Sequence, residues 1–123
     1  MATTMRKNMR PENKIPIELD RARARMVVSA VAMEFSVPDF VLASRHKGSN
    51  QVSYARQIAM YLMRCVYGST KQRIAEVFER HYTTVSHACN LVEEHREDPV
   101  LDKKLLGLEN FLCQAPKGMA PIC

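Results

Sequence analysis

Apolar side chains return every three or four residues in several segments of this chain, which is the spacing of one face of an α-helix. In the first such segment, which starts near residue 17, this spacing joins Ala24, Val27, Val28, Val31 and Phe35. Further segments with helical character follow at about residues 38–42, 53–67, 70–78, 82–97 and 101–112. No segment alternates apolar and polar residues as a half-buried strand would. The pattern therefore predicts an all-α fold of about six helices.

Residues with strong capping preferences mark where some of these helices are expected to begin and end. Ser53 is a good N-cap after the polar loop of residues 44–52, and Gly68 is expected to end the helix that Ser53 begins. Ser69 or Thr70 is expected to cap the short helix that comes next. The buried stripe of the Ser53 helix is expected to consist of Tyr54, Ile58, Tyr61, Leu62, Cys65 and Val66.

The length of 123 residues is that of about one domain. We expect a helical domain over residues 17–112, between a flexible basic tail at 1–16 and a flexible tail at 113–123. No stretch approaches the ~18–20 apolar residues that a membrane span needs. The basic N-terminal residues are not followed by the apolar segment of a secretory signal. A cytoplasmic protein is therefore expected.

Basic residues outnumber acidic residues by 18 to 13, which gives a net charge of +5. The excess lies in residues 44–90, where seven lysines and arginines face only two acidic residues, Glu76 and Glu79. A local basic field indicates a polyanionic partner. An ordinary solvated basic surface would account for the same charge.

The four cysteines do not have the spacing of a metal site. Cys65, Cys89, Cys113 and Cys123 form no CxxC pair, and His87 points to a different side of a helix from Cys89. Cys65 and Cys89 are expected to be small buried hydrophobic residues. Neither a metal nor a cofactor is predicted.

Two short helices joined by the tight connection Glu79–Tyr82 have the layout of a helix-turn-helix. The second helix is expected to bury Val85, Ala88, Cys89 and Val92. Its outer face carries short donors and acceptors where a surface helix normally has lysine and glutamate, namely Thr83, Thr84, Ser86, His87 and Asn90. Such groups suit the base edges in the major groove of DNA. A threonine-rich start of an ordinary helix is the alternative interpretation.

The segment YTTVSHACNLVEE resembles the signature of the C-terminal DNA-binding domain of the bacterial replication initiator DnaA. In that family the helix opens with Asp-His-Thr-Thr-Val and continues through a His-Ala pair, and here Thr83-Thr84-Val85 and His87-Ala88 stand in register. Upstream, SYARQIAMYLMR resembles the family's Pro-Arg-Gln-(Ile/Met)-Ala-Met-Tyr-Leu signature, with a match at every residue of 56–62. The resemblance covers about residues 17–112 and implies an all-α fold of the DnaA C-terminal or Trp-repressor type.

The resemblance also implies which residues contact DNA. Six residues match positions that contact DNA phosphates in the family: Arg56, Gln57, Arg64, Thr70, Lys71 and Gln72. Residues on the face inserted into the major groove are His81, Tyr82, Thr83, Thr84, His87 and Asn90. The family's minor-groove loop corresponds to Arg45, His46 and Lys47. A gapless count puts Gly48 at that loop's arginine position, and a shift of one residue puts Lys47 there.

The turn before the second helix departs from the family pattern. The family's Gly-Gly-Arg-Asp-His turn corresponds here to Glu79-Arg80-His81-Tyr82, which is one residue shorter and has no glycine. His81 stands where the family has an aspartate that could accept a hydrogen bond from a base amino group, and Tyr82 replaces a histidine. We therefore expect this protein to read a related but altered DNA site.

The resemblance implies sequence-specific binding of double-stranded DNA, and the chain has no GxxxxGK[ST] phosphate loop and is too short for the family's ATPase domain. We therefore expect a stand-alone, nucleoid-associated regulator of transcription or replication initiation, and not an enzyme. The alternative is a protein-interaction module that binds the full-length initiator or another replication protein without specific DNA binding. Replacing Arg56 and Arg64 together by alanine would abolish function only under the first hypothesis.

The sequence leaves two further questions open. The family domain reads an asymmetric site as a monomer, but the first long helix and the leucine stripe of 101–112 could pair two chains in a homodimer. Arg21, Arg23 and Arg25 in the first long helix are either a weak polyanion- or membrane-binding surface or an ordinary solvated helix face.

Overall fold

The computed structural model describes residues 15–42 and 49–114, and within these residues the chain forms α-helices and no strand. The helices are α2 (Ile17–Phe35), α3 (Asp39–Leu42), α4 (Asn50–Tyr67), α5 (Lys71–Phe78), α6 (Tyr82–His95) and α7 (Pro99–Cys113). The all-α fold expected from the periodicity is therefore confirmed. None of the described helices is long and apolar enough to cross a membrane. Most of both expected tails lies outside the described residues.

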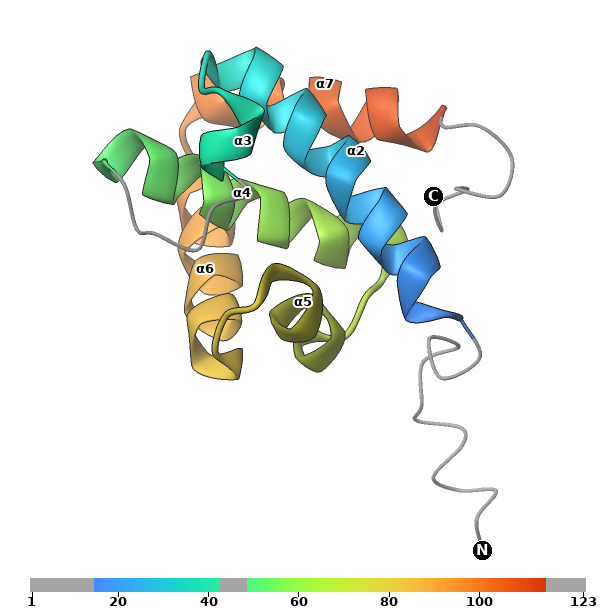
Figure 1. Ribbon diagram of the computed structural model, residues 1–123. Helices are drawn as coiled ribbons and strands as arrows, with labels where there is room; N and C mark the ends of the chain where they lie inside the picture. The colour runs from blue at the N-terminus through green and yellow to red at the C-terminus, as the bar shows by residue number, and fades with distance from the viewer. Residues whose placement is uncertain (1–14, 43–48, 115–123) are drawn as a thin grey trace, which may run out of the picture.

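Helix α4 runs through the middle of the molecule (Figure 1) and packs against each of the other five described helices. Ile58, Leu62 and Met63 in α4 have no exposed surface. Because neighbours cover most sides of α4, its buried residues are not restricted to the single stripe that the sequence predicted. Cys65 was expected in that stripe but is exposed, since it lies at the stripe's edge, where neighbouring helices decide burial.

The start of α4 differs from the expectation. The helix begins at Asn50 and Ser49 is its N-cap, because the Ser49 Oγ accepts a hydrogen bond from the Val52 N–H at 3.2 Å. The prediction that Ser53 caps this helix is therefore wrong. The additional turn buries Val52, and Gln51 Nε2 donates to the Phe35 carbonyl at the end of α2. Both contacts are made between elements, so the local sequence could not reveal them.

The other expected caps around the helix-turn-helix are present. Gly68 ends α4 in the left-handed region, with φ 66°. Thr70 caps α5, because its Oγ1 accepts a hydrogen bond from the Arg73 N–H at 3.1 Å. Helix α6 ends at His95, two residues before the expected end at Glu97. The expected leucine stripe of α7 is buried: Leu101, Leu105, Leu108 and Leu112.

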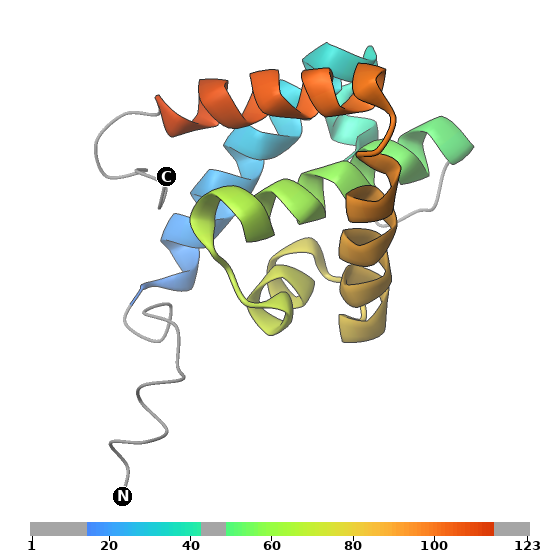
Figure 2. The ribbon, with the colours of Figure 1, turned by 180° about the vertical axis from the view of Figure 1, so that it is seen from behind.

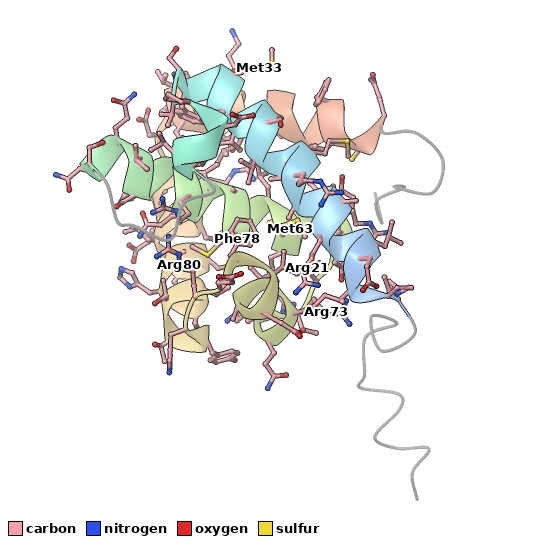
Figure 3. All side chains as sticks on the ribbon, viewed as in Figure 1. Arg21, Met33, Met63, Arg73, Phe78 and Arg80 are labelled. Carbon is pink, nitrogen blue, oxygen red and sulfur yellow. The ribbon has the colours of Figure 1, made fainter. Side chains whose placement is uncertain are left out.

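A buried charge cluster joins α2 to α5. Asp20 in α2 has no exposed surface, and its Oδ2 lies 2.8 Å from the NH1 of Arg73 in α5. Its Oδ1 lies 3.1 Å from the NH1 of Arg23 one turn further along α2. Figure 3 shows Arg73 beside the N-terminal part of α2. This cluster fixes the first helix of the helix-turn-helix against the rest of the fold.

Arg23 does not belong to a basic surface with Arg21 and Arg25. Arg23 has only 8% of its surface exposed, and its guanidinium carbon lies 4.9 Å from the centre of the Tyr67 ring. The expectation of three solvated arginines on α2 is therefore wrong for Arg23, while Arg21 and Arg25 are exposed. The difference arises because Asp20 is buried three residues earlier and requires cationic partners.

Candidate nucleic-acid interface

Helices α5 and α6 form a helix-turn-helix whose turn consists of Glu79, Arg80 and His81. Glu79 ends α5 in the left-handed region, with φ 55°, and the Arg80 N–H donates to the Ala75 carbonyl at 2.9 Å. This arrangement satisfies backbone groups at the helix end without glycine. Figures 1 and 2 show the first turn of α6 beside α5 and its last turn beside α7. The turn therefore holds α6 by its N-terminal end against α5.

His81 is the N-cap of α6. Its Nδ1 accepts a hydrogen bond from the Thr83 N–H at 3.2 Å and lies 2.9 Å from the Thr83 Oγ1. An imidazole nitrogen thus satisfies one of the N–H groups that a helix start leaves without an intrahelical partner. The shortened turn therefore keeps a capped and defined start for α6.

The face of α6 that the sequence predicts to contact bases is exposed. Tyr82 has 46% of its surface exposed, and the other predicted groove residues are exposed as well: His81, Thr83, Thr84, His87 and Asn90. The opposite face is buried as expected, through Val85, Ala88, Cys89 and Val92. The structure thus gathers the six predicted groove residues on the turn and the exposed side of one helix. Their contacts with DNA stay predictions.

Most of the predicted phosphate-contacting residues lie at or near the start of α5. The exposed Arg64 donates from its NH1 to the Ser69 carbonyl at 3.0 Å, next to the N-cap Thr70. Lys71 reaches across to α6, where its Nζ lies 3.3 Å from the Ser86 Oγ. Gln72 is exposed, whereas Gln57, Thr70 and Lys71 are half-buried. A helix N-terminus with nearby cations is suited to a phosphate group.

Arg56 is buried, although it is not part of the buried stripe that the sequence predicted for α4. It is only 5% exposed, and it donates from Nε to the Leu42 carbonyl at 3.0 Å and from NH2 to the Val41 carbonyl at 3.1 Å. Because α4 is surrounded by other helices, a position off its apolar stripe is still inside the protein. Arg56 therefore holds the end of α3, and its phosphate contact stays a prediction.

The predicted minor-groove residues Arg45, His46 and Lys47 lie outside the described residues. They belong to the segment of residues 43–48, which follows Leu42, whose carbonyl accepts the hydrogen bond from Arg56. The described contact therefore fixes the point from which the segment of residues 43–48 starts.

Arg80 is a half-buried basic residue of the turn that the sequence pattern did not single out. Burial, followed by the nearby positive charge of Arg80, lowers the pKa of Arg56. The two guanidinium groups therefore lie close enough to repel each other, which favours an anion beside them. Figure 3 shows Arg80 near the crossing of α4 and α6. Its place directly before His81 was the one signal in the sequence that could have drawn attention to it.

Replacing Arg56 by alanine is expected to lower the free energy of unfolding by about 1–3 kcal/mol, because the carbonyl oxygens of Val41 and Leu42 lose their donor. Replacing the exposed Arg64 by alanine is expected to change it by less than about 1 kcal/mol. Urea unfolding followed by circular dichroism measures both variants. Equal midpoints would contradict the structural role of Arg56. For a test of DNA binding, Arg64→Ala alone is therefore better than the double variant.

The family model described as the bacterial dnaA protein helix-turn-helix matches residues 24–92. The chromosomal replication initiator protein DnaA of Aquifex aeolicus is 42% identical over 67 residues, which cover 54% of this chain and 16% of that protein. The DnaA of Lachnoclostridium phytofermentans is 32% identical over 91 residues, which cover 72% of this chain and 19% of that protein. The chain thus spans about a fifth of the length of these curated relatives.

A solved structure has the same arrangement of helices. The crystal structure of a DNA replication initiation factor superimposes with a TM-score of 0.68 at 33% sequence identity, over 76% of this chain and 29% of that chain. The similarity therefore extends from sequence to fold over most of the described residues.

Proposed function

This chain belongs to the bacterial DnaA helix-turn-helix family, and from this premise we propose that it binds double-stranded DNA with α6 in the major groove. The observation that carries the proposal is the exposed face of α6, where a capped helix presents hydroxyl, imidazole and amide groups and no carboxylate over its first three turns. Groups of this kind hydrogen-bond base edges, and threonine methyl groups contact the methyl group of thymine.

Basic side chains supply the electrostatic part of the proposal. Arg64 and Lys71 lie near the start of α5, and Arg80 lies in the turn directly before α6. Arg45 and Lys47 are the two lysine or arginine residues of the 43–48 segment. Contacts from such groups to phosphates would set the position of α6 along the duplex, while the α6 side chains would read the sequence.

We propose sequence-specific binding at a site related to the DnaA box but altered where His81 and Tyr82 contact it. The proposed mechanism is occupancy, in which the bound protein regulates transcription or replication initiation by covering a site. In this mechanism the protein would compete with the full-length replication initiator for the same DNA sites. The initiator is also the protein partner that we propose. Binding to that initiator without DNA binding is the alternative, and it makes a different prediction for the titration below.

The affinity for duplex DNA is expected to fall as the salt concentration rises. A plot of log affinity against log salt is expected to have a slope of about −4.5, because about five basic side chains would displace counterions. Fluorescence anisotropy with a labelled random-sequence duplex at a series of salt concentrations measures this slope. Arg64→Ala is expected to make the slope shallower by about 1. Lys103→Ala is the matched control, since Lys103 is exposed on α7 and outside the proposed interface. Absence of salt-dependent binding would contradict the proposal and favour the protein-interaction alternative.

A further inference from the structure

The N-cap geometry of α6 determines which hydrogen-bonding group His81 can present to a ligand. The Thr83 backbone N–H donates to the His81 Nδ1 at 3.2 Å. A backbone N–H is a donor only, so this Nδ1 must carry a lone pair and no proton. In a neutral imidazole the proton is then on Nε2. The fold itself therefore selects one tautomer of His81.

The Thr83 hydroxyl is compatible with the same tautomer. Its Oγ1 lies 2.9 Å from the His81 Nδ1. Since that nitrogen carries no proton, the hydroxyl is the donor in this contact as well. The Thr83 oxygen then retains lone pairs that can accept from a ligand. Two neighbouring exposed residues thus present opposite groups, a donor on His81 and an acceptor on Thr83.

His81 is also exposed to solvent, as a residue that contacts a DNA base must be in the free protein. It is exposed at the start of α6, directly beside the exposed Tyr82 and Thr83. Within the imidazole ring Nε2 is not adjacent to Nδ1, so the cap leaves the Nε2–H available to a ligand. One ring nitrogen of His81 thus caps the helix, while the other can donate to a base.

We propose that the Nε2–H of His81 selects a base that presents only acceptors in the major groove, with guanine preferred through its N7 and O6. Cytosine presents only an amino donor there, and adenine pairs its single acceptor N7 with an amino donor, whereas guanine offers two adjacent acceptors to the His81 proton. This inference rests on the proposed function, because it assigns a role to a residue of that same interface. His81 is thereby a specificity-determining residue as well as a structural cap.

The tautomer can be tested on the free protein. Long-range nitrogen–proton correlation NMR at a pH where His81 is neutral distinguishes a proton on Nε2 from one on Nδ1. The expected result is an unprotonated Nδ1 and a protonated Nε2 for His81. A proton on Nδ1 would overturn the inference whether or not the protein binds DNA.

The base preference is tested by selection from random duplex DNA with the wild-type chain and with His81→Asp. Aspartate is also a strong N-cap, so α6 keeps its start, but its carboxylate only accepts hydrogen bonds. We expect one position of the selected site to change from guanine to cytosine or adenine, with a preference of about tenfold in each case. The control is Lys103→Ala on α7, outside the proposed interface, which is expected to leave that position unchanged.

The outcomes separate this inference from the function on which it rests. If the wild-type chain selects a site and His81→Asp selects the same site, His81 is only a cap and the inference is wrong. If the wild-type chain selects no site, the proposed function fails first. Circular dichroism of His81→Asp verifies that the variant is folded, so that a lost site is not mistaken for an altered one.

Discussion

Replacing Asp20 by alanine is expected to lower the free energy of unfolding by about 3–5 kcal/mol. The variant leaves Arg23 and Arg73 largely buried without the carboxylate that lies 3.1 Å from one and 2.8 Å from the other. Two largely buried guanidinium groups that lose their shared buried carboxylate cost far more than the loss of a surface ion pair. Because domains of this size have about 5–15 kcal/mol of stability in total, this loss is a large part of the stability of the folded protein.

Guanidinium chloride unfolding, followed by circular dichroism, measures this loss. Glu34→Ala is the matched control, since Glu34 is an acidic residue of the same helix but is exposed. The control is expected to change the free energy of unfolding by no more than about 0.5 kcal/mol. A loss below about 1 kcal/mol for Asp20→Ala would show that the cluster does not hold α5 against α2.

Replacing Thr84 by glutamate is expected to reduce DNA affinity by at least about 100-fold without loss of folding. Thr84 is exposed in the first turn of α6, three residues after the N-cap His81. A glutamate at this position faces the positive end of the helix dipole and is favourable by about 0.3–1 kcal/mol. The same carboxylate would lie against the groove and be repelled by the phosphates. The variant therefore separates binding from stability.

Anisotropy titration with duplex DNA and thermal unfolding of the same samples measure both effects. Asn110→Glu adds an equal charge to an exposed position of α7 and is the control for net charge. It is expected to weaken binding by less than about threefold, through the long-range field alone. If Thr84→Glu bound DNA as tightly as Asn110→Glu, the face of α6 would not be the DNA-contacting surface.

The longer helices could be predicted from the sequence because each one repeats its apolar residues at helical spacing. The inward residues of α6, such as Val85 and Val92, and the leucines of α7 follow from this rule alone. Gly68 and Thr70 were predictable for a different reason, since their capping chemistry is local. These features depend on neighbours in sequence, which a single chain displays directly.

The misplaced residues depend on contacts between elements. Arg56 was expected outside the buried stripe and Arg23 at the surface, yet both are buried. The α3 carbonyls cover Arg56, and Asp20 together with the distant Tyr67 ring covers Arg23. Ser49 and Ser53 are equally good N-caps by residue type, and the burial of Val52 together with the hydrogen bond from Gln51 to the Phe35 carbonyl favours Ser49. No periodicity within one helix contains this information.

The candidate site was predictable in part. Family resemblance gave the α6 face, and its exposed residues lie together as that resemblance implies. The role of His81 as a cap was not predictable from residue type, because histidine is not among the usual N-caps. The proximity of Arg80 to Arg56 arises only when the turn packs beside α4.

Selection of binding sites from random duplex DNA at about physiological salt tests the central claim most directly. We predict a defined motif related to the DnaA box and changed at one or two positions, and loss of this motif for the folded Thr84→Glu variant. Recovery of an unchanged DnaA box would contradict the altered reading at His81 and Tyr82. No enriched sequence from the wild-type chain would contradict sequence-specific DNA binding itself.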